Sequence, residues 1–140
     1  MKLKILIIMA LAAILALPAA AKKDPKGKAA IEFRDKVYDF GTVKASKGMV
    51  VHEFEFTNTG DAPLMIISAK ADCGCTRTKF DAAPVKPGKR GKIKVTFLTE
   101  GQRGYISKDI KIRTNAPSAK RVTLKITGNV IPDDKKMKRL

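Results

Sequence analysis

The two cysteines of this sequence, Cys73 and Cys75, are the residues whose type and spacing point most directly to chemistry. Only Gly74 separates them. Two thiols this close can form a local disulfide, exchange disulfides with a partner as a redox couple, or bind a soft metal such as Cu(I) as thiolates. The residue types alone leave these three readings open.

The spacing indicates what a disulfide here would do. In a straight strand, Cα atoms two residues apart are separated by about 6.6–6.8 Å, whereas a disulfide prefers about 5.5–6 Å. A bond therefore requires a bend, which Gly74 permits because it lacks a Cβ. Closing so short a loop stabilises a fold by roughly 1.6 kcal/mol, against about 4.7 kcal/mol for a hundred-residue loop. We expect the bond to shape a loop rather than to hold the fold together.

A redox or metal role remains the alternative. Lys70, Arg77 and Lys79 are close in sequence and favour the thiolate form. The Cys-x-x-Cys spacing of thioredoxin-like enzymes is missing. Two cysteines also cannot complete a four-coordinate zinc site, so we predict no bound cofactor.

His52 is the only histidine of the chain, and it shares its strand parity with Phe54 and Phe56. This parity predicts a partly buried histidine rather than a metal ligand or a catalytic base. The alternative is that His52 lies next to the cysteines on a neighbouring strand and forms a Cys-His pair with them. Met49 and Met65 are interpreted as core residues, with a copper site as the alternative.

Glu53 and Glu55 lie on one face of the same strand, with lysine-rich strands available to pair with it. This arrangement predicts an exposed charge ladder across strands rather than an acid/base couple. No nucleophile elbow, phosphate loop, metalloprotease helix or dinucleotide fingerprint occurs in the sequence. We therefore predict that the protein is not an enzyme.

The first 21 residues have the pattern of a secretory signal peptide. Lys2 and Lys4 precede an apolar run over residues 5–17, and Pro18 and three alanines follow it. The run is shorter than the roughly 20 residues that a membrane-spanning helix needs. No cysteine follows it directly, which argues against lipid anchoring. We predict cleavage after Ala21 and a periplasmic or secreted protein without a transmembrane anchor.

The chain is strongly basic, with a formal net charge of +16 that falls to +14 without Lys2 and Lys4. Such an excess favours anionic partners through long-range attraction. Export argues against nucleic acid and leaves anionic surfaces of the cell envelope as candidates. The alternative is a solvated lysine-rich surface without a dedicated ligand.

Between a predicted flexible leader (22–30) and a predicted basic flexible tail (132–140), apolar residues recur with a period of two. Turn residues separate the alternating runs, and no helical stripe persists. This pattern therefore predicts that residues 31–131 form an all-β, antiparallel β-sandwich of about seven strands. The run Leu64–Ile67 is continuously apolar and predicts a strand buried on both faces near its start. The clearest alternating runs cover 50–57, 93–97, 106–113 and 122–130.

The sequence also resembles the bacterial domain of unknown function 1573 family over nearly all of residues 31–131. This resemblance implies an exported immunoglobulin-like domain, related to sandwiches that act as binding modules, and it implies no particular activity. The matching stretches are Tyr38-Asp39-Phe40-Gly41-Thr42-Val43, Phe54-Glu55-Phe56-Thr57-Asn58-Thr59-Gly60, Pro63-Leu64, Asp72-Cys73-Gly74-Cys75-Thr76, Pro87-Gly88, Gly91-Lys92-Ile93 and Leu124-Lys125-Ile126-Thr127-Gly128-Asn129-Val130.

These observations favour an exported, non-catalytic immunoglobulin-like binding or scaffold module of the bacterial cell envelope, with the Cys73–Cys75 pair shaping a loop. A protein partner would bind by strand addition at an open edge or through loops at one end. The alternative is a thiol–disulfide redox or copper-handling protein that uses the same two cysteines.

Overall fold

The alternating runs of the sequence form β-strands whose apolar side chains point to one face. The structure is a computed structural model, and it describes residues 27–133. A single 3₁₀ turn, η1, is the one helical element among these residues. The elements are β1 (Ile31–Phe33), β2 (Val37–Lys44), η1 (Ala45–Lys47), β3 (Met49–Asn58), β4 (Ile66–Ala71), β5 (Thr76–Phe80), β6 (Arg90–Leu98), β7 (Gly104–Thr114) and β8 (Arg121–Ile131).

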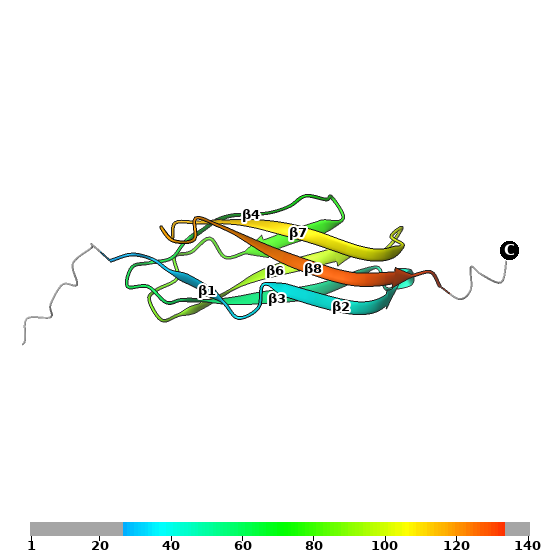
Figure 1. The fold of residues 1–140 in the computed structure, drawn as a ribbon, viewed down its shortest axis with the longest axis horizontal. Coiled ribbons are helices and arrows are strands. Elements are labelled where there is room, and N and C mark those ends of the chain that lie inside the picture. The colour runs from blue at the N-terminus through cyan, green and yellow to red at the C-terminus, as the bar shows by residue number, and fades with distance from the viewer. Residues whose placement is uncertain (1–26, 134–140) are drawn as a thin grey trace, which may run out of the picture.

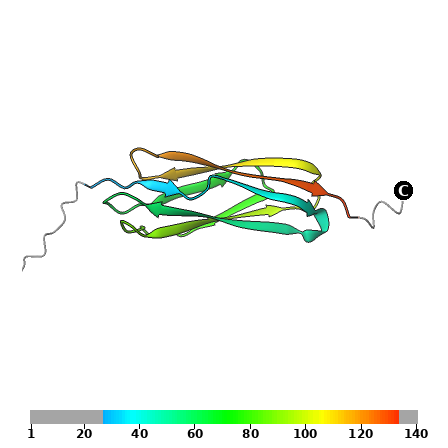
Figure 2. The same ribbon diagram turned by 60° about the horizontal axis from the view of Figure 1, so that its bottom comes forward.

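The strands form two four-stranded sheets that pack face to face, as Figures 1 and 2 show. One sheet has the order β1-β3-β6-β5, and the other has the order β2-β8-β7-β4. The predicted all-β, immunoglobulin-like sandwich is confirmed. The structure has eight strands where the sequence predicts about seven, and residues 34–36 separate β1 from β2, which belong to different sheets.

One strand pair is parallel, and the prediction of a purely antiparallel sandwich is wrong for it. β2 pairs with β8 in parallel, from Val37 opposite Lys125 to Lys44 opposite Ile131. The chain moves from β1 to β2 by changing sheets at residues 34–36, without the reversal that a hairpin would impose. A mixed sheet with one wet face is the result.

The core lies between the two sheets and is built from the inward-facing residues of both. The prediction that the run at 64–67 is buried on both faces is wrong. Leu64 and Ile66 are buried, whereas Met65 and Ile67 are 42% and 52% exposed, because β4 is an edge strand with a wet outer face. The largest fully buried apolar side chains are Phe54, Phe97, Leu64, Ile93, Ile110, Ile112, Leu124, Ile126, Val95 and Val130.

The end of the predicted flexible leader is attached to the sandwich, which corrects the prediction for residues 28–30. Ala29 is buried in the core. The backbone N–H groups of Thr59 and Asp61 donate to the carbonyls of Ala30 and Lys28 at 3.0 and 3.1 Å. These bonds fix the entry of the chain against the turn that follows β3.

The predicted signal peptide (1–21), the start of the leader and most of the predicted tail lie outside the described residues. Within residues 27–133, no helix has the length and hydrophobicity needed to span a membrane.

A close approach of Phe56 to Gly91 generates the first prediction. The two residues face each other across β3 and β6, and a Cβ on Gly91 would lie 2.3 Å from Phe56 Cζ. Gly91→Ala should therefore displace a buried ring and cost about 1–3 kcal/mol of unfolding free energy, measured by urea denaturation. Gly74→Ala is the matched control, because a Cβ there meets no atom within 4 Å. Equal stability of the two variants would contradict this account of the core.

Candidate functional site

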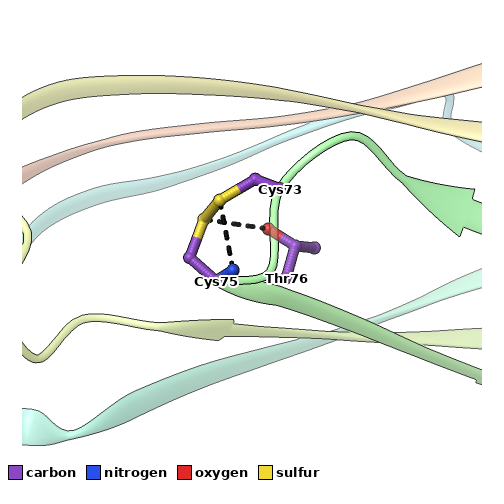
Figure 3. Close-up of a disulfide and its surroundings, with 3 residues drawn as sticks. All are labelled: Cys73, Cys75 and Thr76. Atoms are coloured by element: carbon purple, nitrogen blue, oxygen red, sulfur yellow. Dashed lines mark hydrogen bonds between the residues drawn. A yellow bond between two sulfur atoms is a disulfide. The ribbon is translucent and has the colours of Figure 1, made fainter.

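The disulfide between Cys73 and Cys75 lies where the chain crosses from one sheet to the other. β4 is an edge strand of one sheet, β5 is an edge strand of the other, and residues 72–75 connect them. Figure 3 shows this crossover running between the two layers, with the disulfide on one side of it. The two Cα atoms are 5.2 Å apart, so the chain bends here as a bond between neighbouring cysteines requires.

Backbone hydrogen bonds hold the crossover in addition to the disulfide. The Thr76 N–H donates to the Cys73 carbonyl at 3.1 Å, which closes a turn, and the Leu98 N–H donates to the Cys75 carbonyl at 2.8 Å. The Thr78 hydroxyl donates to the Ala69 carbonyl at 2.6 Å and joins β5 to β4. Cys75 itself is partly buried against the core. The crossover would therefore keep much of its shape without the covalent bond.

Gly74 does not have the role that the spacing argument gave it. Its φ angle is not among the positive ones, and a Cβ at this position would have open space around it. The bend comes from the turn at residues 72–75, which the hydrogen bond from Thr76 closes. A residue with a side chain fits at position 74 in the observed conformation.

An ion pair beside the crossover links it to β7. Lys111 Nζ donates to Asp72 Oδ1 at 3.0 Å, and both side chains are exposed. Such a pair contributes little stability, because water and salt screen it. Proximity along the chain does not reveal this pair, because Lys111 lies on another strand, 39 residues from Asp72.

The register places His52 away from the sulfur atoms. His52 lies opposite Val95, which lies opposite Thr78 on β5. Cys75 instead accepts from Leu98, several residues further along β6. His52 therefore does not share a cross-strand row with the cysteines.

The sequence-predicted half-burial of His52 is confirmed, and its ring lies against Tyr38 of β2. The two rings stack with centroids 3.6 Å apart and an interplanar angle of 8°. Phe40 and Phe54 contact this pair edge-on, at 5.0 and 4.7 Å. Because β2 and β3 belong to different sheets, the stack joins the two sheets on the side opposite the crossover.

Burial in this stack lowers the pKa of His52 below its ordinary value of 6.5, because a partly buried imidazolium loses hydration. The nearby carboxylates of Asp35 and Glu53 act in the opposite direction and do not overcome it.

The methionines do not assemble with the cysteines into a copper ligand set. Met65 precedes β4 and Cys73 follows it, so the strand separates them. Met49 lies opposite Leu98, two strand spacings or about 10 Å from β5. Both methionines are substantially exposed rather than buried in the core, which corrects that expectation. Within the described part of the chain, no three His, Cys, Asp or Glu side chains gather as a metal site would require.

Glu53 and Glu55 form the charge ladder that the sequence predicts. Glu53 faces Lys94 and Glu55 faces Lys92 across β3 and β6. Lys92 Nζ lies 3.0 Å from Glu53 Oε2 and 3.9 Å from Glu55 Oε1. The hydrogen bond that Lys92 donates to Glu53, with the attraction of both carboxylates, raises the pKa of Lys92. The two carboxylates are thereby matched by cations rather than coupled to each other.

β4 ends at the crossover, but its neighbour β7 extends further, so part of β7 has a partner strand on one side only. β4 pairs with β7 from Ile110 to Thr114, whereas β7 begins at Gly104. Among the described strands, only β8 pairs with residues 104–109. Tyr105 in this stretch is 72% exposed. We call residues 104–109 the open β7 edge. The sequence does not reveal the open β7 edge, because an unpaired edge depends on the register between strands and not on the alternation of apolar residues within one strand.

The crossover, its cysteines and the sandwich all lie in one continuous segment of the chain. Residues 31–130 match the family described as Protein of unknown function (DUF1573). The chain belongs to this family. No curated protein matches the sequence.

Solved structures share the fold at low sequence identity. A protein of unknown function from Porphyromonas gingivalis W83 is 22% identical, with a TM-score of 0.63 over 72% of this chain and 46% of that one. The VesB protease of Vibrio cholerae is 15% identical, with a TM-score of 0.58 over 73% of this chain and 32% of that one. This chain therefore spans less than half of the length of each.

A human domain matches over most of both chains. The ASH/PapD-like domain 7 of human CEP192 is 15% identical, with a TM-score of 0.57 over 87% of this chain and 98% of that one. These likenesses show the fold, and the chemistry must be argued from this chain's own residues.

The second prediction concerns the stability that the disulfide provides. A Cys73→Ser/Cys75→Ser variant should lose roughly 1.6 kcal/mol of unfolding free energy or less, because the closed loop is short and hydrogen bonds retain the crossover. Urea denaturation measures this loss. Reduced wild-type protein is the matched control, since it lacks the bond but keeps the sulfur atoms. A loss above about 3 kcal/mol in both samples would show that the bond holds the sandwich together.

The third prediction concerns His52. Its folded-state pKa is lowered, so its contribution to stability is complete above about pH 6.5 and is lost as the pH falls through the folded pKa. The melting temperature should thus drop between about pH 7 and pH 5. His52→Phe keeps an aromatic ring against Tyr38 and should show a smaller drop. An equal drop in both proteins would assign the pH dependence to other groups.

Proposed function

We propose that this protein is an exported, non-catalytic binding module of the bacterial cell envelope that receives an extended segment of a partner protein along the open β7 edge. The open edge carries the proposal. A strand with a partner on one side presents unpaired N–H and C=O groups on the other, and an added strand can satisfy them.

The surroundings of this edge support a bound segment. The disulfide-bonded crossover comes directly after β4, the strand that pairs with the rest of β7. An incoming strand would continue the line of β4 and meet the crossover at one end. Exposed Tyr105 offers the aromatic contact that is common at protein interfaces. The crossover therefore shapes the end of the binding edge, which gives the local disulfide a role other than global stability.

A non-catalytic role is supported by what the polar side chains do. The only histidine of the sequence is stacked against Tyr38. Glu53 and the cation Lys92 are paired at 3.0 Å. Export to the periplasm or the medium is supported by the apolar segment near the N-terminus and by the disulfide, since such bonds persist in oxidising compartments.

The fourth prediction tests the edge by site-specific capture. A photo-reactive phenylalanine analogue in place of Tyr105 should cross-link an envelope protein. The same analogue in place of Val51 is the matched control, because Val51 is 44% exposed on the other sheet. With the purified partner added, those amides of residues 104–109 that point away from β8 should become protected from hydrogen exchange, because strand addition bonds them. Protection elsewhere with none at this edge would contradict the proposal.

A further inference from the structure

Like-charged side chains face each other on the outer side of the sheet that contains β4, β7 and β8. Lys70 lies opposite Lys111 in the β4–β7 register, and Arg113 lies opposite Arg121 in the β7–β8 register. All four side chains are exposed. Like charges directly across strands destabilise a sheet, so two such pairs side by side need an explanation.

Carboxylates balance little of this charge. Lys111 pairs with Asp72 at 3.0 Å, whereas Lys70, Arg113 and Arg121 have no carboxylate partner among residues 27–133. The other sheet differs. It also contains a like-charged pair, Lys79 opposite Lys94, but Glu53 faces Lys94 from β3. On the face of β4, β7 and β8, the ion pairs Lys111–Asp72 and Lys125–Asp109 offset part of the charge and leave Lys70, Arg113 and Arg121 unmatched.

The surface at these cations is hollowed but open. A shallow hollow of about 640 Å³ is lined by both pairs, with Ser68, Thr123 and the carboxylate residue Asp72, which pairs with Lys111, beside them. A second hollow of about 320 Å³ shares Arg113 and Arg121 and adds Lys120 and Ile67. The arginine pair thus lies between two open hollows. We call Lys70, Lys111, Arg113, Lys120 and Arg121 the basic face.

We propose that the basic face docks on an anionic phospholipid membrane surface. Guanidinium groups bind phosphate oxygens through two parallel hydrogen bonds, and lysines add charge without directional demands. Phosphate groups between the paired cations would remove the repulsion that the sheet register creates. Membrane docking does not depend on strand addition at the open β7 edge. It would also orient the protein relative to the membrane surface.

Two features favour a membrane over an acidic protein as the occupant. Open hollows suit many phosphates spread over a plane rather than one enclosed anion. The residues lining them include no aromatic side chain, although protein interfaces depend on such anchors. Ile67, 52% exposed beside Arg113, can enter the headgroup region.

The position of the basic face leaves the open β7 edge accessible. Arg113 lies near the C-terminal end of β7, whereas the open edge covers its N-terminal part from Gly104. β4 pairs with the segment between Arg113 and Ile110. The basic face and the open β7 edge therefore occupy adjacent, non-overlapping parts of the same strand.

The test is binding of the full chain to lipid vesicles. Vesicles of phosphatidylglycerol mixed with phosphatidylcholine are compared with vesicles of phosphatidylcholine alone, which measure any binding by the apolar N-terminal segment. The wild-type protein should bind the anionic vesicles more tightly, and raising the salt from about 50 to about 300 mM should weaken this binding by screening.

Two charge-matched variants decide whether the basic face is responsible. Arg113→Gln/Arg121→Gln should weaken binding to anionic vesicles roughly tenfold to thirtyfold. Lys79→Gln/Lys94→Gln removes the same charge from a like-charged pair on the other sheet and should change binding less than about threefold. Each variant removes a repulsive pair, so both should remain folded, which melting curves check.

Three outcomes would overturn the proposal. Equal weakening by the two variants would show that diffuse charge is responsible. Equal binding of the wild-type protein to both vesicle types would exclude recognition of anionic lipid. Binding of poly-glutamate that depends on Arg113 and Arg121, without vesicle binding, would identify an acidic protein as the occupant.

Discussion

The structure depends on one constraint: two sheets bury their apolar faces against each other, and the chain must pass between them at their edges. Two of these passages join edge strands, at residues 34–36 and at residues 72–75, and they lie on opposite sides of the sandwich. A different local interaction is found on each side. The Tyr38–His52 stack joins the sheets beside the first transition, and the Cys73–Cys75 disulfide stiffens the second. The apolar core between the sheets supplies the main stability. The aromatic stack and the disulfide hold the chain in place where it passes between edge strands.

The two sheets consequently present different outer surfaces. On one, Glu53 and Glu55 lie among the lysines of β6 and offset their charge. On the other, Arg113 and Arg121 face each other, and the edge beyond β4 is open. Core packing determines neither the charge pattern of the outer faces nor the open edge, because outward-facing residues contribute almost nothing to the core. Features that the core does not require are the natural places to look for function.

Much of the fold follows from the sequence, since alternation identifies the inward side chains of each strand and turn residues separate the strands. The half-buried His52 and the exposed carboxylates of Glu53 and Glu55 also follow from the parity of one strand, whereas the lysines that they meet follow from the β3–β6 register. The parallel β2–β8 pair does not, because a chain that changes sheets within three residues leaves no periodic signal. The open β7 edge and the arginine pair could not be predicted either. Both arise from registers between strands that are distant in sequence, and each strand alone is compatible with several registers.

The parallel pairing of β2 with β8 also determines how the domain would carry force. The first and last described residues emerge at opposite ends of the long axis, as Figure 1 shows. Tension between those ends acts first on β1 and, once β1 has been loaded, pulls β2 and β8 in opposite directions along their length. All the hydrogen bonds between them are then sheared together instead of being unzipped one after another. A domain connected this way resists stretching through the β2–β8 pair, and the core side chains of β8 are displaced only when that pair slides.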